Sequence, residues 1–324
     1  MINAAIVGLG RWGQNMVNAV QGKSECLRFV RGCVRHPEPV RDFTRRHGID
    51  MSSDLADVLT DSKVQAVVFA TPHTLHMQQI MAAAAAGKPV FCEKPLTLNR
   101  ADAVRAVAAC GKAGVLLGVG HDKRFWSSMR ELKRVVASGD LGEILHIEGN
   151  SSNEVSRRFF TPWRDSPAES PGGGMTGTGI HILDAFVNLI GPVRRVQAQL
   201  ITRKPPPEVL DTVSVVCEFS NGVSGVLCGV RATPFFWRVH VFGTRGSAEA
   251  VGETGLVLRV SNAKPQHLSF EPVDTIRSEL DLFADAVAGR IQYPIQPAQM
   301  IATVAAFEAV VESMETNAPV LVEQ

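Results

Sequence analysis

The chain has 324 residues, of which 45% are apolar, and 33 lysines and arginines stand against 32 carboxylates. At about 150 residues per domain, this length predicts two domains, each large enough to bury a core. The 20% share of charged residues is typical of a folded protein and excludes a disordered one. The charge balance argues against nucleic acid as the main partner, because binding phosphates needs a basic excess.

The sequence also argues against a membrane or secreted protein. No segment has the roughly 18 consecutive apolar residues of a membrane span, and Met1–Asn3 places no basic residue before an apolar run. The six cysteines are scattered, without Cys-x-x-Cys spacing. We therefore expect a cytoplasmic protein with reduced thiols. We expect no metal site, because no histidine, cysteine or carboxylate cluster has ligand spacing.

The first third of the chain alternates short apolar runs with helical patterns, which is typical of a doubly wound parallel α/β sheet with helices on both faces. The predicted strands are Ile2–Val7, Leu27–Val34, Gln65–Ala70, Val90–Cys92 and Val115–Val119. The predicted helices are Arg11–Val20, a helix opening near Pro37, Thr74–Ala86 and Asn99–Ala113.

After Gly120 the pattern changes to strands joined by turns such as Asn221-Gly222, which fits antiparallel pairing. We predict an α+β domain with a large, mostly antiparallel open sheet, and domain ranges of 1–120 and 121–324. The last helix is a candidate to pack back on the first domain. The predicted strands are Glu143–Gly149, Val193–Ile201, Thr212–Phe219, Val223–Val230, Trp237–Gly243, Ala248–Val251 and Leu256–Val260. The predicted helices are Phe125–Ser138, Thr178–Ile190, Val273–Ala288 and Pro297–Asn317, with a long loop over Ser151–Gly174.

Gly8, Gly10 and Gly13 form a Gly-x-Gly-x-x-Gly pattern between the first strand and the first helix. In a dinucleotide-binding loop the first glycine allows the tight turn, the second lets a pyrophosphate approach, and the third lets helix and strand pack closely. The helix start then offers N–H groups to the phosphates. A tight turn without a ligand is the alternative. The context favours dinucleotide binding, with Arg11 and Trp12 also in the loop.

The end of the second strand bears on which dinucleotide binds. An NAD enzyme usually has a carboxylate about 20 residues beyond the loop, where it accepts from the ribose hydroxyls. Here that stretch holds Arg35 and His36 and no carboxylate. A guanidinium can pair with a 2′-phosphate, so we expect NADP, with NAD as the alternative. These residues could also be solvated surface charges.

Two further motifs follow later strands. Ala-Thr-Pro-His-Thr-Leu-His ends at His76, and Glu93-Lys94-Pro95 ends the fourth predicted strand. With the glycine run 172–174 and the segment Gly179-Ile-His-Ile-Leu-Asp184, the chain resembles the glucose–fructose oxidoreductase, inositol dehydrogenase and MocA family. The resemblance implies a Rossmann domain and a C-terminal domain whose open sheet often forms the interface of a homodimer or homotetramer. It implies hydride transfer between a nicotinamide and a secondary alcohol or ketone of a sugar, cyclitol or cyclic dihydrodiol.

The resemblance also implies roles for particular residues. Lys94 is the expected catalytic group, because a positioned lysine can exchange a proton with a hydroxyl and stabilise an alkoxide. Pro95 biases it toward an extended conformation, often with a cis peptide in the family; the alternative is a surface lysine. His181 matches the family's active-site histidine. Tyr293, the only tyrosine, forms no Tyr-x-x-x-Lys couple. The expected cofactor contacts include Thr71, Pro72, His73, His76, Glu93 and Lys94.

One departure from the family pattern affects the substrate. The family commonly has an aspartate four residues before the histidine, where this chain has Gly177. Its absence weakens any transfer of sugar or inositol specificity and favours a bulkier or less polar substrate. Expected substrate contacts are His121, Arg124, Trp163, Arg164, Thr178 and Asp184. Arg164, with Arg157 and Arg158, could equally belong to a solvated loop, and Trp163 could simply pack.

Three hypotheses follow. The first is an NADP-preferring dehydrogenase or reductase in which Lys94 and His181 handle the proton. The second is a glycosidase, another hydrolase or an isomerase that retains its nicotinamide and oxidises the substrate transiently. The third is a non-enzymatic NADP(H)-binding sensor, which the missing aspartate makes conceivable.

Overall fold

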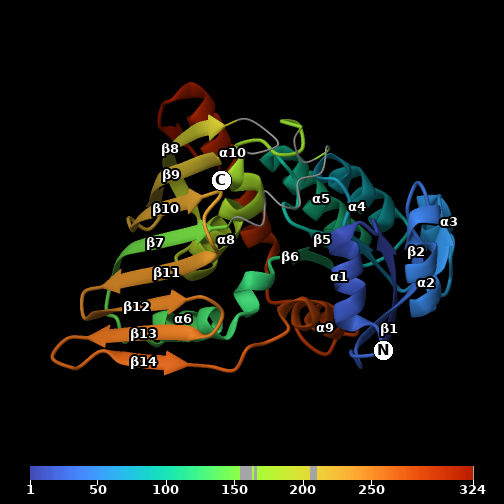
Figure 1. Cartoon of the computed structure of the whole chain (residues 1–324), viewed down its shortest axis with the longest axis horizontal. Helices are drawn as coiled ribbons and strands as arrows, with labels where there is room; N and C mark the ends of the chain where they lie inside the picture. The colour runs from blue at the N-terminus through green and yellow to red at the C-terminus, as the bar shows by residue number, and fades with distance from the viewer. Residues whose placement is uncertain (154–162, 164–165, 205–209, 324) are drawn as a thin grey trace. The chain divides into compact units, whose positions relative to one another are not determined.

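The structure is a computed structural model, and it describes residues 1–153, 163, 166–204 and 210–323 (Figure 1). The chain divides into two units, which are described separately below. The first unit comprises Met1–Thr97, Ala101–Asp122 and Asp274–Met300. The second unit comprises Leu98–Arg100, Lys123–Val273 and Ile301–Gln324. The segment that returns to the first unit contains α9 (Thr275–Val287), and the last helix, α10 (Pro297–Thr316), lies mostly in the second.

The first unit is built on a six-stranded sheet in the order β3-β2-β1-β4-β5-β6, and every pair is parallel. The strand order reverses between β1 and β4, so the loops after these two strands meet at the carboxyl edge, where doubly wound sheets bind ligands. The strands are β1 (Ile2–Val7), β2 (Leu27–Cys33), β3 (Asp50–Ser52), β4 (Ala66–Phe69), β5 (Val90–Glu93) and β6 (Leu117–Gly120). The helices include α1 (Arg11–Val20), α2 (Arg41–His47), α3 (Leu55–Thr60), α4 (His76–Ala85) and α5 (Arg100–Ala113).

The only tyrosine has a structural role at the edge of this sheet. The Tyr293 hydroxyl donates to the carbonyl oxygen of Val119 at 3.1 Å and accepts from the Val119 N–H at 3.3 Å. Because β6 is the last strand of the sheet, these backbone groups point away from its neighbour. The buried tyrosine satisfies them and protects the edge strand.

The second unit contains a nine-stranded sheet in the order β14-β13-β12-β11-β7-β10-β9-β8-β15 (Figure 1). Its pairs are antiparallel except for β7 with β10. The strands are β7 (Ile144–Ser152), β8 (Val193–Lys204), β9 (Leu210–Phe219), β10 (Ser224–Val230), β11 (Phe236–Gly243), β12 (Gly246–Val251), β13 (Gly255–Val260), β14 (Gln266–Ser269) and β15 (Val320–Leu321).

One face of the nine-stranded sheet packs against α6 (Ser127–Ser138), α8 (Ile180–Leu189) and α10. At Gly149 in β7, a Cβ would lie 2.3 Å from the Ile182 side chain of α8. A larger residue there would therefore force α8 away from the sheet. The alternation of buried side chains along the strands places the apolar core on this face.

The opposite face, which we call the outer sheet face, carries the alternate residues of each strand. The register aligns Gln197, Val216, Val226, Glu148 and His240 in one row across five strands. Val216 is 59% exposed, so this row combines apolar surface with polar neighbours.

The structure confirms the predicted fold class and most predicted elements, with shifted ends. The sequence analysis missed β3, β15, β14 and α3, which are too short to show a clear period. The helix predicted over 178–190 begins earlier, as a π-helical turn at Met175–Gly179, before α8. Within the described part of the chain, no helix has the length and apolar character needed to cross a membrane.

Candidate active site

The glycine loop of the first unit has the packing that the sequence pattern predicted. Gly8 has φ +93°, and a Cβ there would lie 2.5 Å from the Ala70 carbonyl oxygen. A Cβ at Gly13 would lie 2.0 Å from the Gly8 carbonyl oxygen, so α1 can approach β1 only with glycine here. Apart from Gly10 and its two chain neighbours, no atom of the described residues lies within 4 Å of a Cβ at Gly10. The loop is therefore tight at Gly8 and Gly13 and open at Gly10.

The start of α1 suits an anion. Gly10 is the N-cap residue and has no side chain to cap the helix, and the first turn, which includes the exposed Arg11 and the half-buried Trp12, contains no carboxylate. Backbone N–H groups at such a start bind phosphates, and the helix dipole favours negative charge. The loop thus fits the pyrophosphate of a dinucleotide.

Arg35 and His36 are exposed just beyond the end of β2. Arg31, which also lies near this strand end, pairs with Asp61 at 3.3 Å. Because Arg31 already pairs with a carboxylate, Arg35 is better placed to bind the 2′-phosphate that distinguishes NADP from NAD.

A buried histidine joins the loop after β4 to the loop after β5. His76, the first residue of α4, has no exposed surface. Its Nδ1 lies 2.8 Å from the Pro95 carbonyl oxygen, and its Nε2 lies 3.1 Å from that of Thr71. Thr71, Pro72 and His73 are half-buried. The structure thus places His76 inside the unit, whereas a direct cofactor contact for it stays a prediction.

The Lys94–Pro95 peptide bond is cis, as the family resemblance led us to expect. Lys94 is half-buried and directly follows β5. Its backbone N–H donates to the Glu93 carboxylate at 3.2 Å. The Glu93 side chain therefore helps to fix the backbone of the turn at Lys94.

Glu93 is buried against the glycine that ends β6. A Cβ at Gly120 would lie 2.6 Å from the Glu93 Oε1 atom, so the carboxylate occupies space that only a glycine leaves. The pKa of Glu93 is raised to about 7: burial is the main cause and the charge of Asp122 adds to it, while hydrogen bonding from Trp12 and the charge of Lys94 act in the opposite direction. Glu93 therefore changes charge near neutral pH. His121 and Asp122, which follow β6, are also buried.

In the second unit, the segment before His181 forms the π-helical turn Met175–Gly179. Such turns often occur at functional sites. The Thr178 hydroxyl donates to the Gly174 carbonyl oxygen at 2.9 Å. Gly177 is exposed, and outside its chain neighbours and the backbone of its own helical turn no atom of the described residues lies within 4 Å of a Cβ there. His181 is buried in the first turn of α8.

Arg124 and Asp184 form a buried, bidentate ion pair. The Nε and Nη2 atoms of Arg124 each donate to one carboxylate oxygen at 2.7 Å, and the two side chains are 5% and 3% exposed. Arg124 also donates to Asn188 at 3.2 Å. Such a pair links residue 124 firmly to α8, and a substrate contact for either residue stays a prediction.

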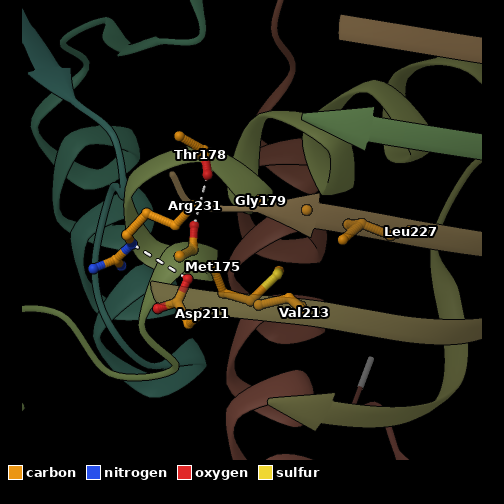
Figure 2. A pocket seen from close by; sticks show the side chains of 9 residues that line it. Met175, Thr178, Gly179, Asp211, Val213, Leu227 and Arg231 are labelled. Carbon is orange, nitrogen blue, oxygen red and sulfur yellow. Dashed lines mark hydrogen bonds and ion pairs between the residues drawn. The ribbon is translucent and has the colours of Figure 1, made fainter. Parts of the chain in front are cut away.

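A small pocket beside the π-helical turn contains two residues that the sequence analysis missed. Asp211 at the start of β9 and Arg231 after β10 lie 3.4 Å apart (Figure 2). A Cβ at Gly173 would lie 2.7 Å from the Asp211 carboxylate. Burial raises the pKa of Asp211, while the charge of Arg231 and the Gly174 N–H lower it. The carboxylate therefore anchors the glycine run.

Two of the expected substrate contacts gain no support from the structure. Trp163 is half-buried, and Arg164 lies outside the described residues. Among the residues that the structure describes, no group of three or more histidine, cysteine and carboxylate side chains could hold a metal ion.

Comparison with known families identifies the chain. Residues 2–121 match the model of an oxidoreductase family with an NAD-binding Rossmann fold, and residues 129–249 match the GFO/IDH/MocA C-terminal domain. The chain therefore belongs to the GFO/IDH/MocA family of NAD-binding oxidoreductases, as its motifs predicted.

Several characterised proteins are similar to this chain. Myo-inositol 2-dehydrogenase of Thermotoga maritima is 30% identical over 78% of this chain and 77% of its own length. The 2,7-anhydro-N-acetylneuraminate hydratase of Escherichia coli is 29% identical over 84% of this chain and 73% of its own length. The WlbA dehydrogenase of Bordetella pertussis, solved with NADH and UDP-GlcNAcA, shares the fold with a TM-score of 0.86 at 22% identity, covering 100% of this chain and 98% of its own.

The raised pKa of Glu93 predicts a pH-dependent stability. Between its ordinary pKa of 4.5 and the folded value of about 7, the folded chain holds a proton that the unfolded chain has lost, so the free energy of unfolding falls as pH rises. In Glu93→Gln this fall should shrink by up to about 3 kcal/mol. Urea unfolding of both proteins at pH 5 and pH 7.5 measures it.

The exposed Glu38 serves as the control: Glu38→Gln should keep the pH dependence of the original protein. Equal pH dependence in Glu93→Gln and the original protein would show that Glu93 titrates normally.

Proposed function

We propose that this family member is an NADP-preferring dehydrogenase or reductase. Its substrate would be a secondary alcohol or ketone of a sugar, cyclitol or cyclic dihydrodiol. The main support is the carboxyl edge of the first sheet, where an open glycine loop and the Glu93-Lys94-Pro95 turn belong to one unit. Gly8, Gly10 and Gly13 would hold the pyrophosphate, and Thr71, Pro72 and His73 would line the adjoining loop. A bound nicotinamide supplies the hydride acceptor or donor.

Lys94 is the proposed proton-transfer residue. Its amine takes the hydroxyl proton during oxidation and returns it during reduction, and its ammonium form stabilises a developing alkoxide. Glu93, the preceding residue in the chain, is buried and interacts electrostatically with Lys94. At pH values below about 7 Glu93 is mostly protonated, so its attraction for the ammonium form increases as pH rises.

His181 is the proposed second proton-handling group. It lies at the start of α8, after a turn anchored through Asp211 and Thr178. An imidazole at this position can hold a substrate hydroxyl or accept its proton.

The open space at Gly177 supports a bulky or less polar substrate. An exposed glycine with no described atom near its Cβ position leaves room that a carboxylate side chain would fill. Cyclic dihydrodiols are therefore included beside sugars and cyclitols, with His121 and Thr178 as proposed contacts.

A second candidate is a reaction with no net change of redox state. The Escherichia coli relative is named a hydratase, and addition of water leaves the overall oxidation state unchanged. A retained nicotinamide in this chain would serve such a glycosidase or isomerase reaction. Product analysis separates the candidates, since only a dehydrogenase accumulates reduced or oxidised dinucleotide.

We also propose a cytoplasmic location, supported by six cysteines that are all free thiols in the structure.

Replacing Lys94 tests the chemical proposal. Lys94→Met keeps an unbranched side chain of similar size and removes the amine that carries the proton, so kcat should fall about 100-fold to 10,000-fold. Binding of NADPH, measured by fluorescence titration, should stay within about threefold. Turnover is followed on a panel of polyols, ketoses and cyclic dihydrodiols. Lys63→Met, at an exposed position, is the control, and undiminished turnover in Lys94→Met would remove Lys94 from its role.

Replacing Arg35 tests the choice of cofactor. Loss of a charged hydrogen bond to the 2′-phosphate should weaken NADPH binding about tenfold to 100-fold, while NADH binding changes little. Titration calorimetry with both dinucleotides measures the ratio for Arg35→Ala. The control Arg130→Ala, at an exposed site on α6, should leave the ratio of NADPH to NADH affinity unchanged. A ratio unchanged by Arg35→Ala would contradict the NADP assignment.

We further propose a homodimer or homotetramer formed through the outer sheet face. Exposed Val216 and its neighbour Val226 supply apolar surface there, and Glu148 pairs with Arg238 beside them. A buried charge is costly in an apolar interface, so Val216→Arg should shift the mass measured by sedimentation toward smaller species. Ile291→Arg, at a 39% exposed site in the first unit, should not. A monomeric original protein would refute the proposal.

A further inference from the structure

The two ring nitrogens of His76 each face a carbonyl oxygen. Nδ1 lies 2.8 Å from the Pro95 oxygen, and Nε2 lies 3.1 Å from the Thr71 oxygen. A carbonyl oxygen only accepts hydrogen bonds, so any bond here must be donated by the ring. A neutral imidazole has a single N–H, so it can donate to only one of the two oxygens, and the Pro95 contact is the shorter.

The two carbonyl groups belong to different loops. Pro95 follows Lys94 across the cis peptide bond. Thr71 follows Ala70, whose carbonyl oxygen would lie 2.5 Å from a Cβ at Gly8. The Thr71 side of the histidine is thus packed against the glycine loop, and the Pro95 side adjoins the lysine turn.

Burial makes these contacts hard to replace. His76 has no exposed surface, so water cannot easily substitute for a lost ring hydrogen bond. The neighbouring ring of His73 meets it edge-on, with 5.7 Å between ring centroids. Removing the Nδ1 donor would deprive the buried Pro95 carbonyl oxygen of this hydrogen bond, and the Glu93-Lys94-Pro95 turn would be held less tightly.

We propose that His76 is a positioning residue for Lys94: its Nδ1–H donates to the Pro95 carbonyl group and fixes the Glu93-Lys94-Pro95 turn against the loop that contains Thr71. This inference rests on the proposed function for the meaning of Lys94 in catalysis. The positioning itself can be measured without a substrate.

Two amide substitutions separate the two ring nitrogens. The side-chain N–H₂ of asparagine is as far from the backbone as Nδ1, and that of glutamine is as far as Nε2. His76→Asn therefore keeps the donor to Pro95, and His76→Gln keeps the donor to Thr71. His267→Gln, at an exposed histidine of β14, is the control for handling and labelling.

The readout is the rate at which the Lys94 amine of the full chain reacts with trace acetic anhydride across a range of pH, followed by peptide mass spectrometry. His76→Gln should raise the Lys94 labelling rate roughly fivefold, as expected for loss of one hydrogen bond, and shift its pH profile. His76→Asn should stay within about twofold of the original protein. Equal profiles in His76→Gln and the original protein, or an equal change in both variants, would overturn the inference.

A measurement on the unmodified protein covers the case in which a variant fails to fold. Long-range ¹H–¹⁵N spectra distinguish a protonated ring nitrogen from an unprotonated one. At neutral pH Nδ1 of His76 should carry a proton, and a ring protonated only at Nε2 would refute the inference. The proposed function is judged separately, because retained turnover in Lys94→Met would defeat it while leaving these results intact.

Discussion

The close approach of three loops at the carboxyl edge of the first sheet is the constraint on which the candidate site depends. The glycine loop can reach Ala70 only because Gly8 has no side chain, and α1 can reach the same loop only because of Gly13. His76 then links Thr71 to Pro95 from within the unit. The residues proposed to bind the phosphates and to transfer the proton therefore lie on loops that contact one another within one unit.

Burial at this edge also sets the electrostatics. Glu93 fills the space above Gly120, and the loss of water around it raises its pKa to about 7. The same carboxylate accepts the backbone N–H of Lys94. The Glu93 carboxylate thus holds the turn and also contributes to the electrostatic environment of Lys94. In the second unit, the buried carboxylate of Asp211 likewise accepts a backbone N–H, that of Gly174, and so anchors the glycine run before His181.

Local patterns were sufficient to predict the parallel sheet and the glycine loop, because each depends on residues close together in sequence, whereas the lysine turn was expected from the family resemblance. Arg124 and Asp184 are 60 residues apart, and their mutual pairing depends on tertiary packing that no spacing reveals. Asp211 and Arg231 meet because β9 and β10 pair. His76 was recognised as part of a motif, but only the fold shows that its ring points inward.

We propose above that the glycine loop and the lysine turn together form one dinucleotide and proton-transfer site. A crystal structure of the protein with bound NADPH tests it most directly. We expect the pyrophosphate at Gly10, the 2′-phosphate at Arg35 and the nicotinamide beside Lys94, with the His76 contacts intact. A dinucleotide bound away from the glycine loop, or a nicotinamide remote from Lys94, would contradict it.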